Sequence, residues 1–358
     1  MDSRLKRFRA LLKEQSLDAY IVLKPENRRY LSGFTGSSGI LVIGHEDAAL
    51  VTDFRYMTQA KEELRPGFRV EKHEKEIAPA IAGVVKGLGA KTVGFESDYL
   101  TWNLHEKLAS ELGAEIQLLP REGLVESLRI VKDQSEIERI SRAARLGDEA
   151  FSHILGFMRP GMSEIDVALE LEWFMRKNGA DKMGFDVIVA SGHRGALPHG
   201  KPSTKKLVPG DLVVMDFGAM MDGYCADMTR TVGIGKIDAR AKEIYDIVRK
   251  AQQAGLDALK AGLTGQEADQ ASRKVIIEAG YGDYFGHALG HGVGLAVHEL
   301  PRLSESYPVA LPEGTVVTVE PGIYIPDWVG VRIEDLVVVH GDGPEILTHS
   351  TKDLIEIG

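Results

Sequence analysis

The stretch DFGAMMDGYCADMTR, residues 216–230, decides the fold of the second half of the chain. At its centre is Asp222-Gly223, a dipeptide favoured in two-residue hairpin turns because both central residues adopt positive φ. On either side of the turn, apolar residues alternate with other types, as they do in antiparallel strands. We therefore predict a hairpin in which Asp216 lies opposite Thr229.

Two aspartates of this hairpin, Asp216 and Asp227, are predicted to share one face. With Asp216 opposite Thr229, Asp227 is its diagonal neighbour at roughly 7 Å. A shift of the turn by one residue would leave both on one face, because an odd number of positions separates them. Two half-buried carboxylates repel each other, so a shared proton, a basic partner or a metal ion must compensate. A solvated hairpin face is the alternative, and this stretch alone does not decide between them.

Length and composition indicate two domains. The chain has 358 residues, of which 44% are hydrophobic, enough for two cores. Lys and Arg total 43 against 53 Asp and Glu, without long runs of one sign, which argues against nucleic acid and anionic membrane as main partners. No apolar run approaches the length of a membrane span, and the charged N-terminus does not resemble a signal peptide. With Cys225 as the single cysteine, we expect a cytoplasmic protein and a buried, unreactive thiol.

Residues 1–125 alternate between helical and strand patterns, which is typical of an α/β domain. Helices are expected at about 2–16, after Asp53, and at about 101–112. Short apolar strands lie between them.

Residues 126–358 are predicted to form an α+β domain, in which helices back one antiparallel sheet. Two of the helices begin with capping-box pairs, Asp133 with Glu136 and Thr264 with Glu267. The expected helices run from Asp133 to about 157, from 163 to 178, from about 238 to 261, and from 264 to 279.

A second predicted hairpin carries two more acids. Glu320 ends the run VVTVE and Glu334 ends the run GVRIE, on either side of the loop PDWVG. An even separation across an odd-centred or bulged loop lets both side chains face one way, although a loop of this length leaves the register open. Four carboxylates are therefore expected in pairs on one face of the sheet.

Histidines in glycine-rich surroundings join this set. The stretch FGHALGHGVGLAVHE supplies His287, His291 and His298, and LPHG supplies His199. Glycine lets the backbone approach a bound group closely and adopt unusual φ values. We therefore interpret these four histidines as residues of a site, with isolated structural histidines as the alternative.

The charge of the predicted site indicates metal ions. Four clustered carboxylates are neutralised by two divalent cations, and carboxylates can bridge two ions about 3.5 Å apart in a hydrolytic site. One imidazole among four carboxylates is an oxygen-rich ligand set. Such a set suits manganese or a similar ion, whereas a typical zinc site would contain thiolates.

In order and context, five of these positions resemble the ligand set of the pita-bread metallopeptidases, which include aminopeptidase P, prolidase and methionine aminopeptidase. The matching motifs, within about residues 125–358, are DFG, ADMTRT, GHGVG, EPGIY and VRIED. The first domain, with NRRYLSGFTGS and VTDFRY, resembles the creatinase-type domain of Xaa-Pro peptidases. The ligand positions are Asp216, Asp227, His291, Glu320 and Glu334.

The resemblance implies a pita-bread catalytic domain with two divalent ions, most simply manganese, with cobalt or zinc as alternatives. Asp216 would chelate one ion, His291 and Glu320 would hold the other, and Asp227 and Glu334 would bridge them. The implied catalytic residues are His199, His298 and Glu320, with Glu320 as the general base and His298 stabilising the oxyanion. The implied substrate-binding residues are His287, Arg302, Tyr324 and Arg332. Arg332 would also orient the bridging glutamate, with a structural ion pair as the alternative.

The implied reaction is hydrolysis of the bond between an N-terminal residue and proline in short peptides, by a homodimer. Prolidase, which cuts dipeptides, is favoured because Arg302, four residues after His298, would clamp a dipeptide carboxylate, although a surface cation is the alternative. Aminopeptidase P, which acts on longer peptides, stays open. A metal-free creatinase-like hydrolase and a non-catalytic peptide-binding module are disfavoured, because all five ligand positions are intact.

Overall fold

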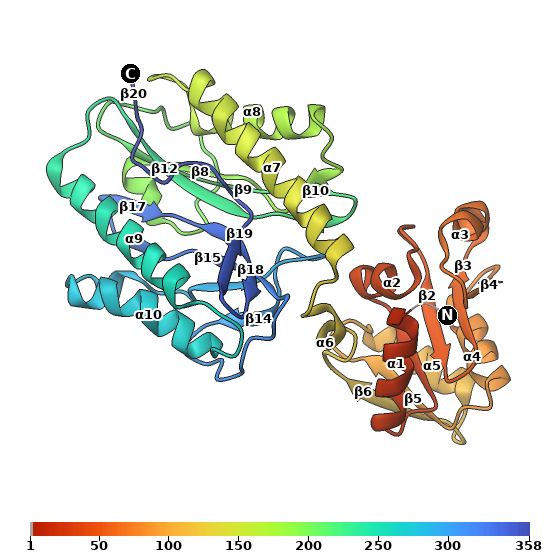
Figure 1. Cartoon of the computed structure of the whole chain (residues 1–358). Helices are drawn as coiled ribbons and strands as arrows, with labels where there is room; N and C mark the ends of the chain where they lie inside the picture. The colour runs from red at the N-terminus through yellow and green to blue at the C-terminus, as the bar shows by residue number, and fades with distance from the viewer. Residues whose placement is uncertain (1–2) are drawn as a thin grey trace. The chain divides into compact units, whose positions relative to one another are not determined.

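The computed structural model describes residues 3–358, and the chain folds into two compact units with the boundary between Arg129 and Ile130. The first unit is built on a mixed six-stranded sheet in the order β4-β3-β2-β1-β5-β6 (Figure 1). Its strands are β1 (Ala19–Val22), β2 (Ile40–Gly44), β3 (Ala48–Thr52), β4 (Arg69–Lys72), β5 (Thr92–Glu96) and β6 (Gln117–Arg121). Its helices are α1 (Ser3–Glu14), α2 (Pro25–Ser32), α3 (Met57–Glu63), α4 (Ile77–Gly87), α5 (Trp102–Leu112) and α6 (Glu126–Arg129).

Alternation along β1 explains how helices cover both faces of this sheet. Ile21 belongs to the buried cluster that α4 and α5 contribute to, through residues such as Val85 and Leu108. Tyr20 points to the opposite face, where its ring meets Phe8 of α1 edge-on at 5.5 Å between centroids. The predicted α/β architecture of the first domain is confirmed.

The second unit places strands between two helix pairs, α7 with α8 and α9 with α10 (Figure 1). These helices span α7 (Gln134–Phe157), α8 (Glu164–Lys177), α9 (Ala239–Ala258) and α10 (Gly265–Glu278). Both predicted capping boxes are present, at Asp133 with Glu136 and at Thr264 with Glu267. The strands are β7 (Lys182–Met183), β8 (Ile188–Ser191), β9 (Leu212–Phe217), β10 (Ala219–Met221), β11 (Tyr224–Cys225), β12 (Met228–Ile234), β13 (Gly290–Gly292), β14 (Glu299–Leu303), β15 (Val316–Val319), β16 (Gly322–Ile325), β17 (Val329–Arg332), β18 (Asp335–His340), β19 (Gly343–Ile346) and β20 (Glu356–Ile357).

The first hairpin has the predicted register. Asp216 lies opposite Thr229, and the turn residues Asp222 and Gly223 have φ values of 46° and 74°. Both φ values are positive, as a two-residue hairpin turn with the twist of its strands requires. Cys225 is buried in this hairpin, as expected.

The second hairpin is interrupted on both of its sides. Val319 pairs with Asp335 on one side of the interruption, and Gly322 pairs with Arg332 on the other. Both pairs have the same register, so Glu320 and Glu334 face each other in the gap between them. The turn is centred on Asp327, which has a φ of 58°, so the odd-centred loop that the sequence allowed is the observed one.

The expectation of one antiparallel sheet is wrong. The strands of the second unit form groups of two, three, four and five, and β20 pairs with β12 in parallel. The ladder breaks at the acids, where the Glu334 N–H donates to the Thr229 carbonyl at 3.1 Å. Since Thr229 is the partner of Asp216, this break joins the two acid-bearing hairpins.

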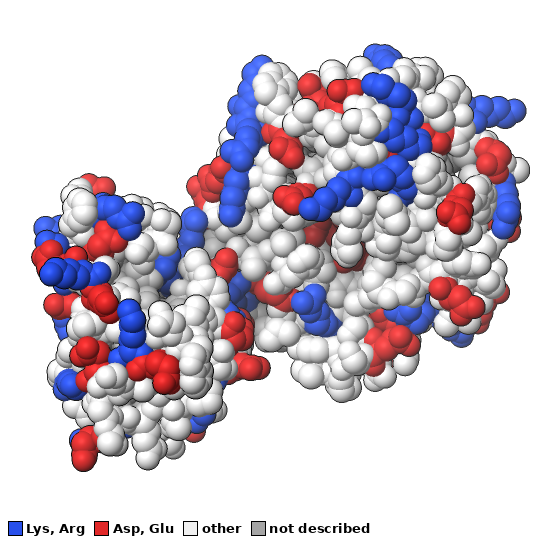
Figure 2. Space-filling model, turned by 180° about the vertical axis from the view of Figure 1, so that it is seen from behind, with Lys and Arg blue, Asp and Glu red and all other residues white. Residues whose placement is uncertain are grey.

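Charged side chains are spread over the surface. On the face shown in Figure 2, Lys and Arg are interspersed with Asp and Glu. Within residues 3–358, no helix is both long and apolar enough to cross a membrane.

A close backbone contact holds the segment that carries His199 against the second hairpin. An added Cβ at Gly330 of β17 would lie 1.8 Å from the Gly195 carbonyl oxygen, in the short helix η2 (Gly192–Ala196). Neither backbone can move away without repacking its neighbours, so this position requires glycine for space rather than for φ.

We predict that Gly330→Ala destabilises the second unit by roughly 1 to 3 kcal/mol, the usual range for overpacking. The matched control is Gly341→Ala, because an added Cβ there meets no atom within 4 Å. Thermal unfolding of both variants checks this prediction, and equal unfolding temperatures would contradict it.

Candidate metal centre

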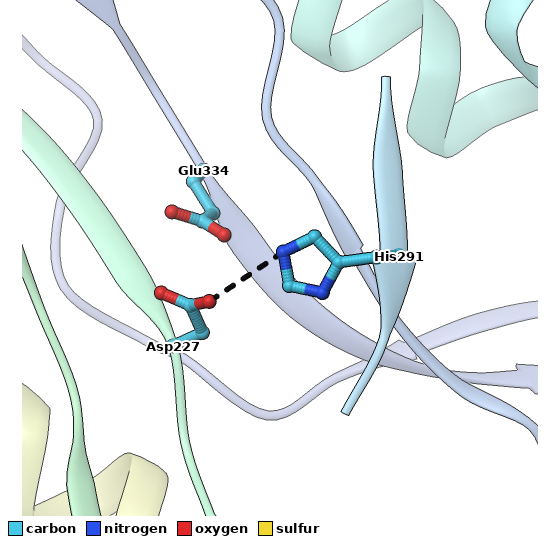
Figure 3. A group of neighbouring side chains, drawn as sticks. All are labelled: Asp227, His291 and Glu334. Carbon is cyan, nitrogen blue, oxygen red and sulfur yellow. Dashed lines mark ion pairs between the residues drawn. The ribbon is translucent and has the colours of Figure 1, made fainter. Parts of the chain in front are cut away.

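Three buried side chains converge from separate parts of the second unit (Figure 3). Asp227 precedes β12, His291 lies in β13, and Glu334 lies in the gap between β17 and β18. One ligand atom of each lies within 4.8 Å of the others. The three residues are only 5%, 7% and 1% exposed.

Two further acids complete the group. The Glu320 Oε1 atom lies 3.2 Å from His291 Nε2, and Asp227 Oδ2 lies 3.7 Å from the same nitrogen. Asp216 lines the same cavity, whose volume is about 720 Å³. All five predicted ligand positions therefore surround one cavity.

His291 is oriented by its own strand. Its Nδ1 lies 3.2 Å from the Gly292 carbonyl oxygen, which leaves Nε2 directed at the acids. An added Cβ at Gly290 would lie 2.0 Å from the Thr318 carbonyl oxygen, and one at Gly292 would lie 2.2 Å from the Leu300 carbonyl oxygen. The glycines around His291 are thus needed for close approach of neighbouring backbone, which then fixes the imidazole.

Burial and mutual repulsion shift the ionisation of three acids. Burial, reinforced by the charges of Glu334 and Asp216, raises the pKa of Asp227 well above its usual value. Burial, reinforced by Glu320 and Asp216, raises the pKa of Glu334 in the same way. Burial also raises the pKa of Asp216, although Arg332 opposes this shift. Without a cation, these carboxyls are pushed towards protonation.

Glu320 is the exception. Burial alone would raise its pKa, but the hydrogen bond and positive charge of His291 outweigh burial and lower the pKa to about 2. Thr318 also donates to Glu320 Oε1, at 3.1 Å. Glu320 therefore stays a carboxylate near neutral pH.

Two carboxylate oxygens show where a cation fits. Asp216 Oδ1 and Glu334 Oε1 are buried and have no hydrogen-bond partner among the described residues. The second oxygen of each is held by protein, Asp216 Oδ2 by Arg332 at 2.6 Å and Glu334 Oε2 by Thr229 at 2.7 Å. Buried oxygens left in this way call for water or an ion, and an acid-rich cavity favours a hard divalent ion. The residues present fit a metal centre.

Arg332 contacts a different acid from the one expected. Its guanidinium pairs directly with Asp216, and its Nε donates to Thr229 Oγ1 at 3.0 Å. Thr229 in turn donates to Glu334. Arg332 was expected to orient Glu334. Within residues 3–358 it forms no direct hydrogen bond with that glutamate and reaches it through Thr229.

A hydrogen-bond chain extends from Arg332 along the cavity wall. Arg332 Nη1 donates to the Tyr324 hydroxyl at 2.8 Å, and this hydroxyl lies 2.9 Å from His287 Nε2. His287 Nδ1 lies 2.8 Å from the Ala288 carbonyl oxygen. Burial lowers the pKa of His287 and raises the pKa of Tyr324 to about 12. The hydrogen bonds therefore run in one direction: Arg332 donates to Tyr324, Tyr324 donates to the neutral imidazole of His287, and His287 donates to the Ala288 carbonyl oxygen.

The remaining predicted residues, His199, His298 and Arg302, also line the cavity and are exposed. The His298 ring meets the His291 ring edge-on, at 4.4 Å between centroids. Among residues 3–358, no side chain forms an ion pair with Arg302. These three groups are available to a molecule in the cavity.

Two threonines that hold the acids, Thr229 and Thr318, were not predicted as site residues. Nor was the cavity wall from α8, which includes Leu169 and Glu172. A signal existed for Thr229, because the predicted register places it opposite Asp216. None existed for the wall, because a helix face that lines a cavity has the same pattern as one that faces solvent.

Two family models match the chain. The model of metallopeptidase family M24 matches residues 138–341, more than half of the chain. The model of the creatinase/prolidase N-terminal domain matches residues 4–131.

Similar proteins span the whole chain. An Xaa-Pro dipeptidase of Pyrococcus furiosus is 38% identical over 99% of this chain and 100% of its own length. A solved Xaa-Pro dipeptidase from Bacillus anthracis is 46% identical with a TM-score of 0.96, covering 98% of both chains. A solved X-Pro aminopeptidase from Thermotoga maritima is 40% identical with a TM-score of 0.90, covering 97% of this chain and 100% of its own. The chain belongs to metallopeptidase family M24 and carries the creatinase/prolidase N-terminal domain.

Proposed function

We propose that this metallopeptidase hydrolyses the bond before proline in Xaa-Pro dipeptides. The observation that carries the proposal is that five metal-ligand candidates share one cavity with an arginine that has no ion-pair partner among residues 3–358. Relatives named Xaa-Pro dipeptidases, similar over the full chain, support it.

The geometry and the family support the following assignment of metal-holding residues. Asp216 and its unpartnered oxygen would hold one ion, His291 and Glu320 the other, with Asp227 and Glu334 between them. When bound, divalent ions lower the pKa of a water molecule and polarise a carbonyl group. Manganese suits a set of four carboxylates and one imidazole, and cobalt or zinc are the alternatives.

The chain's own residues supply the proton handling. Glu320, which lines the cavity 3.2 Å from His291 Nε2, accepts the proton of the attacking water. His298 and His199, exposed in the cavity, donate hydrogen bonds to the oxygen on which negative charge develops. The substrate's free α-amino group would bind a metal ion or an acidic residue, which restricts cleavage to the N-terminal bond.

Arg302 sets the length of the substrate. Its planar guanidinium suits bidentate binding of a carboxylate, and only a dipeptide carries its C-terminal carboxylate next to the scissile bond. An aminopeptidase that accepts longer Xaa-Pro peptides is the second candidate, because the relative from Thermotoga maritima carries that name.

The homodimer, the cytoplasmic location and the absence of nucleic-acid partners stay predictions from the sequence.

We predict that Asp227→Asn abolishes activity and loosens at least one metal ion, because an amide lacks the charge that a bridging ligand supplies. The matched control is Asp222→Asn, in the turn of the same hairpin, which should keep its metal. Elemental analysis of both purified variants, with turnover of an Xaa-Pro dipeptide, checks this. Full metal content and near wild-type turnover in Asp227→Asn would overturn the dinuclear assignment.

His298→Ala should lower kcat by about 100-fold or more with metal content unchanged, as for a group that acts mainly in the transition state. His340→Ala, outside this cavity, serves as the control. Steady-state kinetics and metal analysis test the pair. Metal loss in the His298 variant would show that His298 is a ligand instead.

Arg302→Ala should lower kcat/KM for an Xaa-Pro dipeptide by roughly 1.5 to 3 kcal/mol, or about 10- to 150-fold, the range for a charge-assisted hydrogen bond. Hydrolysis of an Xaa-Pro-Yaa tripeptide should change little. Arg302→Lys keeps the charge but not the fork, so it should recover only part of the loss. If both substrates are affected equally, or neither is, the carboxylate clamp is wrong and the aminopeptidase candidate is preferred.

A further inference from the structure

The position of the His298 imidazole depends on the loop that carries it. Within residues 3–358, no hydrogen bond holds this ring. Its aromatic neighbour is His291, whose ring it meets edge-on. A donor to a developing negative charge must nevertheless be held within about 0.5 Å of its productive position. The segment between β13 and β14, residues 293–298, must therefore be fixed by other means.

The Glu299 side chain packs against this loop and hydrogen-bonds to it. Its carboxylate packs so closely against the loop that an added Cβ at Gly294 would lie 2.4 Å from Glu299 Oε1. Its Oε2 accepts from the Ala296 N–H at 3.4 Å. On its other side, the Gly294 carbonyl accepts from the Cys225 N–H at 2.8 Å. The loop is thus held between the Glu299 carboxylate and the hairpin that carries Asp227.

Lys132 fixes the Glu299 carboxylate in turn. Lys132 Nζ lies 2.8 Å from Glu299 Oε1, and the two side chains are only 1% and 6% exposed. The lysine backbone is anchored as well, because its N–H donates to the Gly314 carbonyl at 2.9 Å. A buried ion pair contributes little net stability compared with apolar residues of similar size. We therefore interpret the ion pair as a contact that fixes the position of the Glu299 carboxylate.

The same arrangement recurs behind two other cavity histidines. Glu164, fully buried, pairs with Arg194 and accepts from the backbone N–H groups of Ser191 and Ser203, at the two ends of the segment that carries His199. Asp269, also fully buried, pairs with Arg273, which donates to the His287 carbonyl oxygen. Each of the three histidine-bearing segments rests on a buried acid paired with a cation.

We propose that Lys132 and Glu299 are positioning residues for His298: their buried ion pair holds the loop so that the imidazole meets the reacting carbonyl oxygen. Neither side chain lines the cavity, so both act through His298. The proposal deepens the proposed peptidase function and rests on it.

A double-mutant cycle tests the proposal. The variant K132M/E299Q removes both charges of the ion pair together. In the wild-type background it should lower kcat for Xaa-Pro by about 10- to 100-fold, as for displacement of a catalytic group by a fraction of an ångström to 1 Å. KM should stay within about 2-fold, because His298 acts in the transition state. In the H298A background the same change should cost less than about 2-fold, because the group it positions is absent. Equal losses in both backgrounds would overturn the proposal.

A second variant moves the carboxylate without changing charge. Gly294→Ala places a methyl group 2.4 Å from the position that Glu299 Oε1 now holds, and it should lower kcat in the same background-dependent way. The control is K24M/E126Q, a neutralised ion pair in the first unit, which should leave kcat unchanged. Full kcat in Gly294→Ala, or an equal loss of kcat in the control, would contradict the positioning role.

A readout apart from activity separates this proposal from the proposed function. In the metal-free protein, the His298 imidazole proton resonance can be identified by its absence in H298A, and K132M/E299Q should shift it while leaving the His105 resonance in place. An unchanged His298 resonance would refute the positioning role. Failure of the wild-type enzyme to cleave Xaa-Pro would refute the proposed function alone.

Discussion

Repulsion among four carboxylates in one buried cavity is the constraint on which the second unit depends. Asp216, Asp227, Glu320 and Glu334 lie where burial disfavours charge, and three of them have raised pKa values as a result. A fold that brings such groups together must supply compensating charge or donors. Here the protein supplies only part of that compensation, through Arg332, Thr229 and His291. The oxygens left over define a place for cations.

The strand arrangement follows from this constraint. Each hairpin presents two acids, and the ladder of the second hairpin breaks where its acids turn inward. The Glu334 N–H then bonds to the Thr229 carbonyl of the first hairpin instead. The interruption that divides the sheet is therefore also the contact that brings the two pairs of acids together.

Local signals in the sequence were sufficient for the first hairpin. They left the register of the second hairpin open and did not predict the contact between the two. The Asp222-Gly223 turn specified the register of Asp216 and Thr229, because positive φ at both residues admits one type of turn. The capping boxes likewise marked two helix starts from short-range chemistry. The partner of Arg332 and the buried pair of Lys132 with Glu299 join residues more than 100 positions apart. No local pattern specifies such pairs, because only the packed fold selects them.

The same repulsion links metal binding to the ionisation of the protein. In the metal-free chain, Asp227 and Glu334 bind protons that the unfolded chain releases, because their folded pKa values are raised. The folded state then carries more protons than the unfolded state, so these two groups make folding less favourable as pH rises above their ordinary pKa values. A divalent ion in the cavity stabilises the same carboxylates in their charged form and releases those protons. The acids that weaken the metal-free fold near neutral pH are thus the ones that metal binding stabilises, and the fold and the metal centre depend on each other through one set of charges.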